Sequence, residues 1–155
     1  MEQKKHFQTI VNKKAYFDYQ VVETLEAGVE LSGPETKSLR LGQASLKDSY
    51  VLISGAGAQI HHWQISPYRF ARNEEYDIQR PRKLLLHRKE IEHLRGVLQQ
   101  QRVSLVPLRI YLKGNRFKVQ LGIVRGKKQY EKREQIKKRD LRREIEREVK
   151  TRIKI

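Results

Sequence analysis

Two strands joined by a tight turn are predicted by VPLRIYLKGNRFKVQLGI, residues 106–123. Apolar residues alternate along both arms around Gly114-Asn115, a dipeptide typical of a two-residue hairpin turn. The alternating residues are Val106, Leu108, Ile110 and Leu112 before the turn, and Phe117, Val119, Leu121 and Ile123 after it. Pro107 cannot donate a hydrogen bond to a neighbouring strand, so it predicts a sheet edge or a bulge.

More strands and two helices are predicted before this hairpin. Residues 16–31 alternate with a break at Gly28, which predicts one long strand or two collinear ones. SYVLISGAGAQIHHWQI, residues 49–65, predicts two strands around a glycine turn, and RKLLL, residues 82–86, predicts a short one. SGPETKSLRLG, residues 32–42, has a capping residue and a proline at its start and a glycine at its end.

The second helix is predicted over residues 87–101, where Ile91, Leu94 and Leu98 lie at helical spacing. The whole pattern indicates a mainly β fold, an OB-like antiparallel barrel of about six strands with two to three helices. Such small barrels often bind nucleic acids, although a fold alone does not establish a function.

Positive charge is concentrated at the C-terminus. The 155 residues carry a net charge of +16, and residues 125–155 hold half of it, with 14 Lys and Arg against 6 Asp and Glu. Such a charge predicts strong attraction to polyanions. We expect a basic N-terminal arm over residues 1–14, the barrel over 15–125 and a basic tail over 126–155.

The tail has a narrow apolar stripe, because apolar residues recur only every fourth position. They are Leu141, Ile145, Val149 and Ile153. A stripe this thin cannot anchor a core, and an isolated helix of this kind is marginal in water. We therefore expect the tail to be disordered alone and helical when bound to a partner.

Common catalytic and metal-binding patterns are missing from the sequence. There is no cysteine, and no Walker A, Gly-x-Ser-x-Gly or His-Glu-x-x-His motif occurs. His61 and His62 are adjacent in a predicted strand and would face opposite sides, while His87 and His93 are off the i,i+4 register. We expect no enzyme activity, no metal and no cofactor. No apolar run approaches the ~18 residues of a membrane span, so we expect a soluble, cytoplasmic protein.

Basic residues with one aromatic among them form GKKQYEKR, residues 126–133. Cations bind phosphates and aromatic rings stack on bases, so the combination is typical of RNA-binding segments. A single exposed Lys or Arg is most often only solvated surface. Tyr130, however, lies outside any predicted core and among seven cations between Arg125 and Lys138.

Four motifs together resemble the SmpB (small protein B) family, the bacterial partners of transfer-messenger RNA (tmRNA). They are EAGVELSGPETKSLRLGQASLKDSYV, RKLLLHRKEI, SLVPLRIY and GKKQYEKR, in this order along nearly the whole chain. The resemblance implies an adaptor that binds the tRNA-like domain of tmRNA and, with elongation factor Tu held through aminoacylated tmRNA, brings it to stalled ribosomes. It implies that the tail enters the empty messenger channel near the decoding centre of the small subunit. We expect the adaptor to be a monomer.

The resemblance also implies which residues bind RNA. For tmRNA they are Phe17, Glu26, Arg40, Arg82, Leu85 and Lys118, and for ribosomal RNA they are Lys127, Lys128, Tyr130, Glu131, Lys132 and Arg133. The ring of Phe17 would stack on a base, and Leu85 would pack on a base or sugar. Glu26 would accept a hydrogen bond from a base edge or orient a neighbouring cation. The cations Arg40, Arg82 and Lys118 would bind phosphates.

Two other functions are compatible with parts of the sequence. A structural ribosomal-type protein with a tail in ribosomal RNA explains the charge equally well, but it does not explain the occurrence of EAG, KSLR and KLLL together. A membrane-surface protein that uses the tail as an amphipathic helix is disfavoured, because the narrow stripe has no Trp or Phe.

Overall fold

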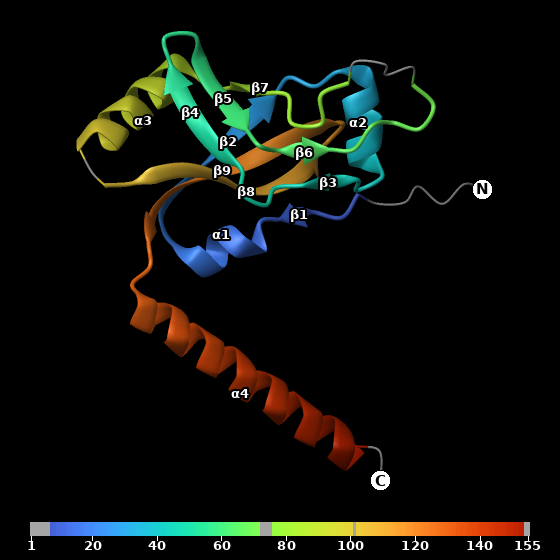
Figure 1. Ribbon diagram of the computed structural model, residues 1–155, viewed down its shortest axis with the longest axis vertical. Coiled ribbons are helices and arrows are strands. Elements are labelled where there is room, and N and C mark those ends of the chain that lie inside the picture. Colours follow the sequence, from blue (N-terminus) through green and yellow to red (C-terminus); the bar gives the residue numbers. More distant parts are fainter. Residues whose placement is uncertain (1–6, 72–75, 101, 154–155) are drawn as a thin grey trace.

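The computed structural model describes residues 7–71, 76–100 and 102–153. Within these ranges it has nine strands and four helices, and Figure 1 shows a sheet-rich body from which the last helix projects. The strands are β1 (Ile10–Val11), β2 (Tyr19–Val29), β3 (Ala44–Ser45), β4 (Tyr50–Ser54), β5 (Gly57–His61), β6 (Gln64–Ile65), β7 (Arg82–Leu85), β8 (Ser104–Lys113) and β9 (Arg116–Gly126). The helices are α1 (Lys13–Asp18), α2 (Gly33–Arg40), α3 (Arg88–Gln100) and α4 (Gln129–Ile153). Residues 1–6 of the expected arm and 154–155 of the expected tail lie outside the described residues.

Seven strands form one antiparallel sheet in the order β1-β8-β9-β2-β7-β5-β4, and β3 pairs separately with β6. Among the described residues the edge strands β1 and β4 are not hydrogen-bonded to each other, although β4 lies against β8. The predicted mainly β class is confirmed. The sheet is OB-like and curved without being a fully closed barrel, and it has more and shorter strands than the sequence indicated.

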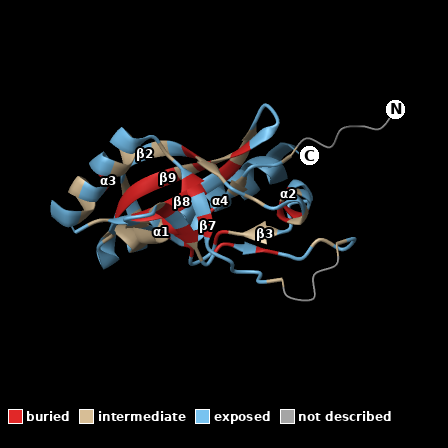
Figure 2. Cartoon of the chain, turned by 90° about the horizontal axis from the view of Figure 1, so that it is seen from above, coloured by how far each residue is buried: buried red, intermediate tan, exposed pale blue. Residues whose placement is uncertain are grey.

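The hairpin of β8 and β9 has the predicted register around Gly114 and Asn115, with Lys113 paired to Arg116. Gly114 has a φ of 63°, which such turns require and glycine adopts without strain. The register shifts between Pro107 and Arg109, so the predicted bulge is confirmed. Figure 2 shows that buried residues follow these two strands through the body.

The start of the predicted strand at residue 16 is wrong, because residues Lys13–Asp18 form α1. The Asn12 side chain accepts a hydrogen bond from the Ala15 N–H (3.2 Å), which caps the helix. Asn12 also donates its side-chain amide to the Pro107 carbonyl (2.9 Å). The expected arm is therefore shorter than residues 1–14, because β1 and α1 already belong to the body.

Strand β2 runs without interruption through Gly28, so the first of the two alternatives, one long strand, is the one observed. A Cβ on Gly28 would lie 3.2 Å from the Leu85 Cβ on β7, tighter than most side-chain contacts. The glycine therefore permits a close approach of two strands, and it does not end one.

Helices α2 and α3 are confirmed close to their predicted bounds. Ser32 and Glu35 form a capping box at the start of α2, with the Ser32 N–H donating to the Glu35 carboxylate at 2.9 Å. Gly42 follows the helix with a φ of 72°. In α3, Leu94 is fully buried and joins the core around Trp63.

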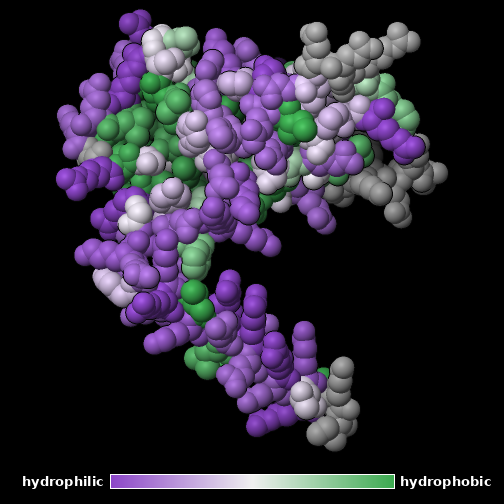
Figure 3. Space-filling view, in the orientation of Figure 1, coloured by the Kyte–Doolittle hydropathy of each residue, from purple (hydrophilic) through white to green (hydrophobic). Residues whose placement is uncertain are grey.

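Helix α4 contributes nothing to the core, because none of its residues is buried. Its stripe residues Leu141, Ile145 and Val149 are exposed, and Figure 3 shows the helix covered almost entirely by hydrophilic side chains. The structure thus has the tail in the helical state predicted for its bound form. Its disorder when free in solution stays a prediction.

Candidate nucleic-acid interface

Three of the predicted tmRNA contacts lie together on one face of the sheet. Gly28 on β2 is paired with Leu85 on β7 and with Lys118 on β9. Lys118 is paired in turn with Tyr111 on β8. Glu26 precedes Gly28 by two positions and so shares its side of the sheet. We call these residues, Glu26, Gly28, Leu85, Tyr111 and Lys118, the sheet face.

A shallow groove crosses the sheet face where Gly28 has no side chain. Leu85, half-exposed at 50 %, and Lys118 line it on either side of Gly28, and His87 is also among the lining residues. An apolar side chain can pack on a sugar or a base while a neighbouring cation binds the phosphate of the same nucleotide. The groove therefore has the chemistry expected for Leu85 and Lys118.

Glu26 is held by two groups that the sequence reasoning missed. The Tyr111 hydroxyl donates to its carboxylate, and the Lys113 ammonium lies 3.3 Å from it. The bond from Tyr111 is the main cause that lowers the pKa of Glu26. Burial and the bond to Glu26 raise the pKa of Tyr111 to about 12. The side chain of Glu26 is therefore an oriented carboxylate, and the outward positions of the predicted hairpin could have indicated Tyr111 and Lys113.

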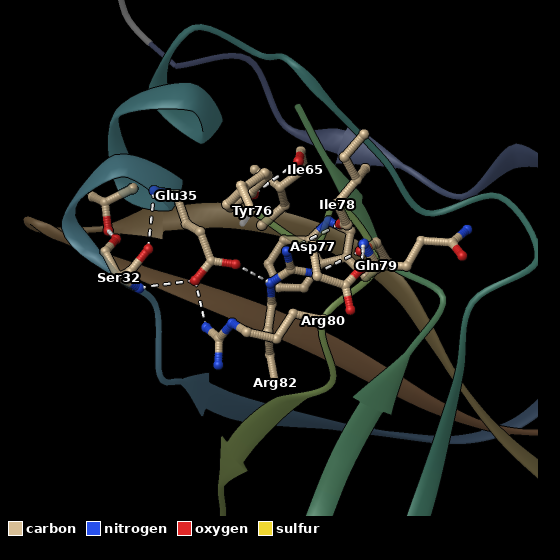
Figure 4. Close-up of polar contacts among 11 residues, drawn as sticks. Ser32, Glu35, Ile65, Tyr76, Asp77, Ile78, Gln79, Arg80 and Arg82 are labelled. Atoms are coloured by element: carbon tan, nitrogen blue, oxygen red, sulfur yellow. Dashed lines mark hydrogen bonds and ion pairs between the residues drawn. The ribbon is translucent and has the colours of Figure 1, made fainter. Parts of the chain in front are cut away.

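Arg82 does not lie on the sheet face, and a direct phosphate contact from it is contradicted. Its side chain is 0 % exposed, because the alternation along β7 turns Arg82 and Leu84 inward while Leu85 points out. Figure 4 shows its guanidinium directed at Glu35, with Nε 2.5 Å from Oε2. It also donates to the carbonyls of Trp63 (2.5 Å) and Ile78 (3.2 Å).

This buried ion pair fixes the position of α2. Glu35 accepts from Arg82, from the backbone of Ser32 and from Arg80. Burial acts to raise the pKa of Glu35, but these hydrogen bonds outweigh it and hold the pKa below its ordinary value. Arg82 therefore supports the helix that carries Arg40.

Arg40 lies at the exposed C-terminal end of α2, away from the sheet face. Within the described residues it forms no salt bridge. Lys37 lies one turn before it on the same side of the helix. The position suits the predicted phosphate contact.

Phe17 lies on α1 and faces the start of the tail. The Lys132 ammonium is 5.9 Å from its ring centroid, and a cavity lined by Phe17, Ile136 and Arg139 separates α1 from α4. A residue predicted for tmRNA and one predicted for ribosomal RNA thus contact each other. Phe17 is not brought together with the sheet face.

The same region holds the tail against the body. Lys132 forms an ion pair with Asp18 at 3.3 Å. The Lys127 ammonium donates to the Tyr16 carbonyl (2.9 Å), and the Lys127 N–H donates to the Asp18 carbonyl (3.0 Å). We call these residues, with Phe17, the α1–α4 junction. The sequence reasoning missed it, because it joins segments more than one hundred residues apart.

The tail residues predicted for ribosomal RNA divide into two groups. Lys127 and Lys132 form the polar contacts of the junction, whereas Lys128 and Arg133 are exposed. Tyr130 is 56 % exposed and its hydroxyl lies 3.4 Å from the half-buried Glu131. Lys128, Tyr130 and Arg133 are therefore free to meet a polyanion.

The described ranges contain neither a metal-binding cluster nor a membrane-spanning helix. No group of three or more His, Asp or Glu residues is placed there to hold a metal ion. None of the described helices is long and apolar enough to cross a membrane.

Comparison with known proteins shows the family to which the chain belongs. The SmpB protein family model matches residues 9–151. The SsrA-binding protein of Geotalea uraniireducens is 49% identical over 134 residues, which cover 86% of this chain and 89% of that protein. The SsrA-binding protein of Pelobacter propionicus is 48% identical over 140 residues, covering 90% and 92%.

A solved structure of the same family has a similar fold. It is described as "tmRNA-SmpB: a journey to the center of the bacterial ribosome" and superposes with a TM-score of 0.65 at 38% identity. The match covers 78% of this chain and 85% of the solved chain. From the family match and the relatives together, this chain belongs to the SmpB family.

Proposed function

We propose that this chain binds the tRNA-like domain of tmRNA and delivers it to ribosomes stalled without a stop codon. The observation that carries the proposal is the sheet face, where Leu85 and Lys118 line one groove and the oriented carboxylate of Glu26 lies on the same side of the sheet. The names of the SsrA-binding relatives support the partner. The chain acts as a cytoplasmic adaptor and catalyses no bond change, because the ribosome carries out peptide transfer.

The body and the tail have separate roles in this proposal. The sheet face and Arg40 hold tmRNA, with Lys118 and Arg40 on phosphates and Leu85 on a base or sugar. Helix α4 enters the empty messenger channel near the decoding centre, where Tyr130 stacks on an unpaired base and neighbouring cations bind ribosomal phosphates. Elongation factor Tu takes part through aminoacylated tmRNA.

A reconstituted tagging reaction tests the proposal. Ribosomes stalled on a message without a stop codon are mixed with alanyl-tmRNA, elongation factor Tu and GTP, and transfer of the nascent peptide to tmRNA is measured. We expect transfer only when the full chain is present. We expect a chain stopped after Arg125 to bind tmRNA and fail in transfer, because it lacks the tail. Equal transfer with and without the chain would contradict the proposal.

A further inference from the structure

An exposed aromatic segment lies beside α2, outside the sites described above. It consists of Tyr68, Arg69 and Phe70, in the connection between β6 and β7. Phe70 is 78% exposed, the largest value among the large apolar residues of the described ranges. A phenylalanine this exposed keeps most of its contact with water on folding, so packing in the core does not explain it.

The rings of this segment are held in place by cations. The ring centroids of Tyr68 and Phe70 are 5.6 Å apart and the rings meet edge to face. The Arg69 guanidinium carbon is 5.6 Å from the Phe70 centroid, and the Lys37 ammonium on α2 is 5.4 Å from the Tyr68 centroid. These are cation–π distances, so both rings are supported while Phe70 still presents surface to solvent.

One backbone hydrogen bond joins the residues just before the segment to those just after α2, and a second closes a turn at the segment itself. The Ser66 N–H donates to the Gln43 carbonyl (2.9 Å), and the Ala71 N–H donates to the Tyr68 carbonyl (3.1 Å). The α2 end also carries Arg40 and the 63% exposed Leu41. The aromatic segment lies beside α2 at the right of Figure 1, and Lys37, one turn before Arg40, joins the helix to the segment through the Tyr68 ring.

The charges of this region favour a polyanion. Lys37, Arg40 and Arg69 are its cations. The acidic residue of α2, Glu35, is buried and its carboxylate is bound by Arg80 and Arg82, so it does not neutralise them. Within the described residues these three cations form no ion pair. Exposed aromatic rings beside such cations have the composition of a surface that stacks on an unpaired base and binds the adjoining phosphates.

We infer that the aromatic segment is a second RNA contact, in which an unpaired base of the tRNA-like domain stacks on Phe70 while Lys37, Arg40 and Arg69 bind the flanking phosphates. The inference rests on the proposed function, because it takes its partner from it. It extends the predicted contact of Arg40 into a surface that is separate from the sheet face. Tyr68 supports Phe70 at its edge and keeps it in position.

Equilibrium binding of the tRNA-like domain to variants of the full chain tests the inference. Phe70→Ala should weaken binding about tenfold, within the range measured for loss of one base–aromatic stack. Phe70→Tyr keeps a ring and should bind within about twofold of the unmodified chain. Leu52→Ala is the matched control, since Leu52 is a 50% exposed apolar residue on β4, and it should leave binding unchanged.

The salt dependence separates the ring from the cations. Phe70→Ala removes no charge, so the slope of log K against log salt should stay the same. Arg69→Ala should reduce this slope by about one, because one phosphate contact is lost. Circular dichroism of each variant shows that the fold is intact.

The outcomes distinguish this inference from the proposed function. If the unmodified chain does not prefer the tRNA-like domain over ordinary tRNA, the proposed function fails. If the unmodified chain prefers it and Phe70→Ala binds equally well, the inference alone is overturned. If Phe70→Ala binds the domain normally but loses affinity for ribosomes, the segment serves another partner and the inference is also overturned.

Discussion

Glu35 shows how one side chain can serve two purposes. As the last residue of the capping box, Glu35 accepts a hydrogen bond from the Ser32 N–H. As a buried anion, it neutralises the charge of Arg82. Both side chains of the Arg82–Glu35 pair are 0% exposed, so removal of either one leaves a charge in the core without its partner. The pair is therefore expected to matter more for stability than any surface ion pair of this chain.

Glu35→Gln should lower the free energy of unfolding by about 3 kcal/mol at pH 7, because the buried guanidinium of Arg82 loses its counter-ion. Arg80→Gln is the control. It removes the partner of Glu35 whose side chain is 47% exposed, and it should cost less than about 1 kcal/mol. Urea unfolding followed by circular dichroism measures both, and equal small losses for the two variants would contradict the account.

The difference between Glu35→Gln and the unmodified chain should depend on pH. The pKa of Glu35 is lower in the folded chain than in the unfolded one, so its contribution is complete above its unfolded pKa of about 4.3. It is lost as the pH falls through the folded pKa. The difference in unfolding free energy between the two proteins should therefore narrow as the pH falls from 7 to 3. A constant difference over this range would show that the carboxylate charge is not responsible.

Tyr130→Ala should spare tmRNA binding and impair peptide transfer to tmRNA, because Tyr130 is exposed on α4 and is expected to stack on ribosomal RNA. Tyr130→Phe keeps the ring and should transfer peptide at close to the normal rate. The tagging reaction described above measures transfer, and binding is measured separately. Equal transfer rates for Tyr130→Ala and the unmodified chain would contradict the role of the ring.

At the scale of elements, α4 depends on the body only through its first turns. The α1–α4 junction holds Lys127 and Lys132, and residues beyond it are exposed. Figure 1 shows the rest of the helix extending away from the sheet. The orientation of the tail is therefore set by a few polar contacts, which an RNA partner could exchange for its own.

Asp18→Asn should loosen the tail without affecting the body, because it removes the 3.3 Å ion pair with Lys132. The pair is partly exposed, so the free energy of unfolding should change by less than about 1 kcal/mol. Spin labels on cysteines introduced at Gln59 and Arg147 report the distance between body and tail, and its distribution should broaden. Asp48→Asn, which removes the exposed pair with Lys14, is the control and should leave the distribution unchanged. Identical distributions for all three proteins would contradict a role for the junction.

Hydrogen exchange should separate α4 from the sheet in the free protein. Since no residue of α4 is buried, its hydrogen bonds are opened by local unfolding at little cost in free energy. Amides of residues 137–153 should exchange far faster than those of β8 and β9. Protection of the tail equal to that of β9 would show a stable free helix and would contradict the predicted disorder of the isolated tail.

At the scale of the whole molecule, the sequence predicted what is local and missed what is long-range. The β8–β9 hairpin and the cap of α2 follow from neighbouring residues, and both are confirmed. Phe17, Tyr19 and Val21 alternate as in a strand, but the Asn12 cap and the burial of Ala15 favour α1.

The candidate site was predictable to a similar extent. The sheet face follows from strand alternation together with the family resemblance. Arg82 was misplaced, because a charged residue was expected to face solvent, and its buried partner Glu35 lies forty-seven positions earlier in the chain. The α1–α4 junction depends on tertiary packing that no local pattern encodes.

The central claim is that the body carries the specific RNA site and the tail serves a later step on the ribosome. The most direct test is binding to the tRNA-like domain of tmRNA and to an ordinary tRNA across a salt series, for the full chain and for a chain stopped after Arg125. The body should fold without α4, because no residue of that helix is buried. We predict that both chains prefer the tRNA-like domain at high salt, and that truncation lowers the affinity for both RNAs alike. If neither chain discriminates and truncation removes most of the binding, the tail is a general polyanion-binding segment and the claim is wrong.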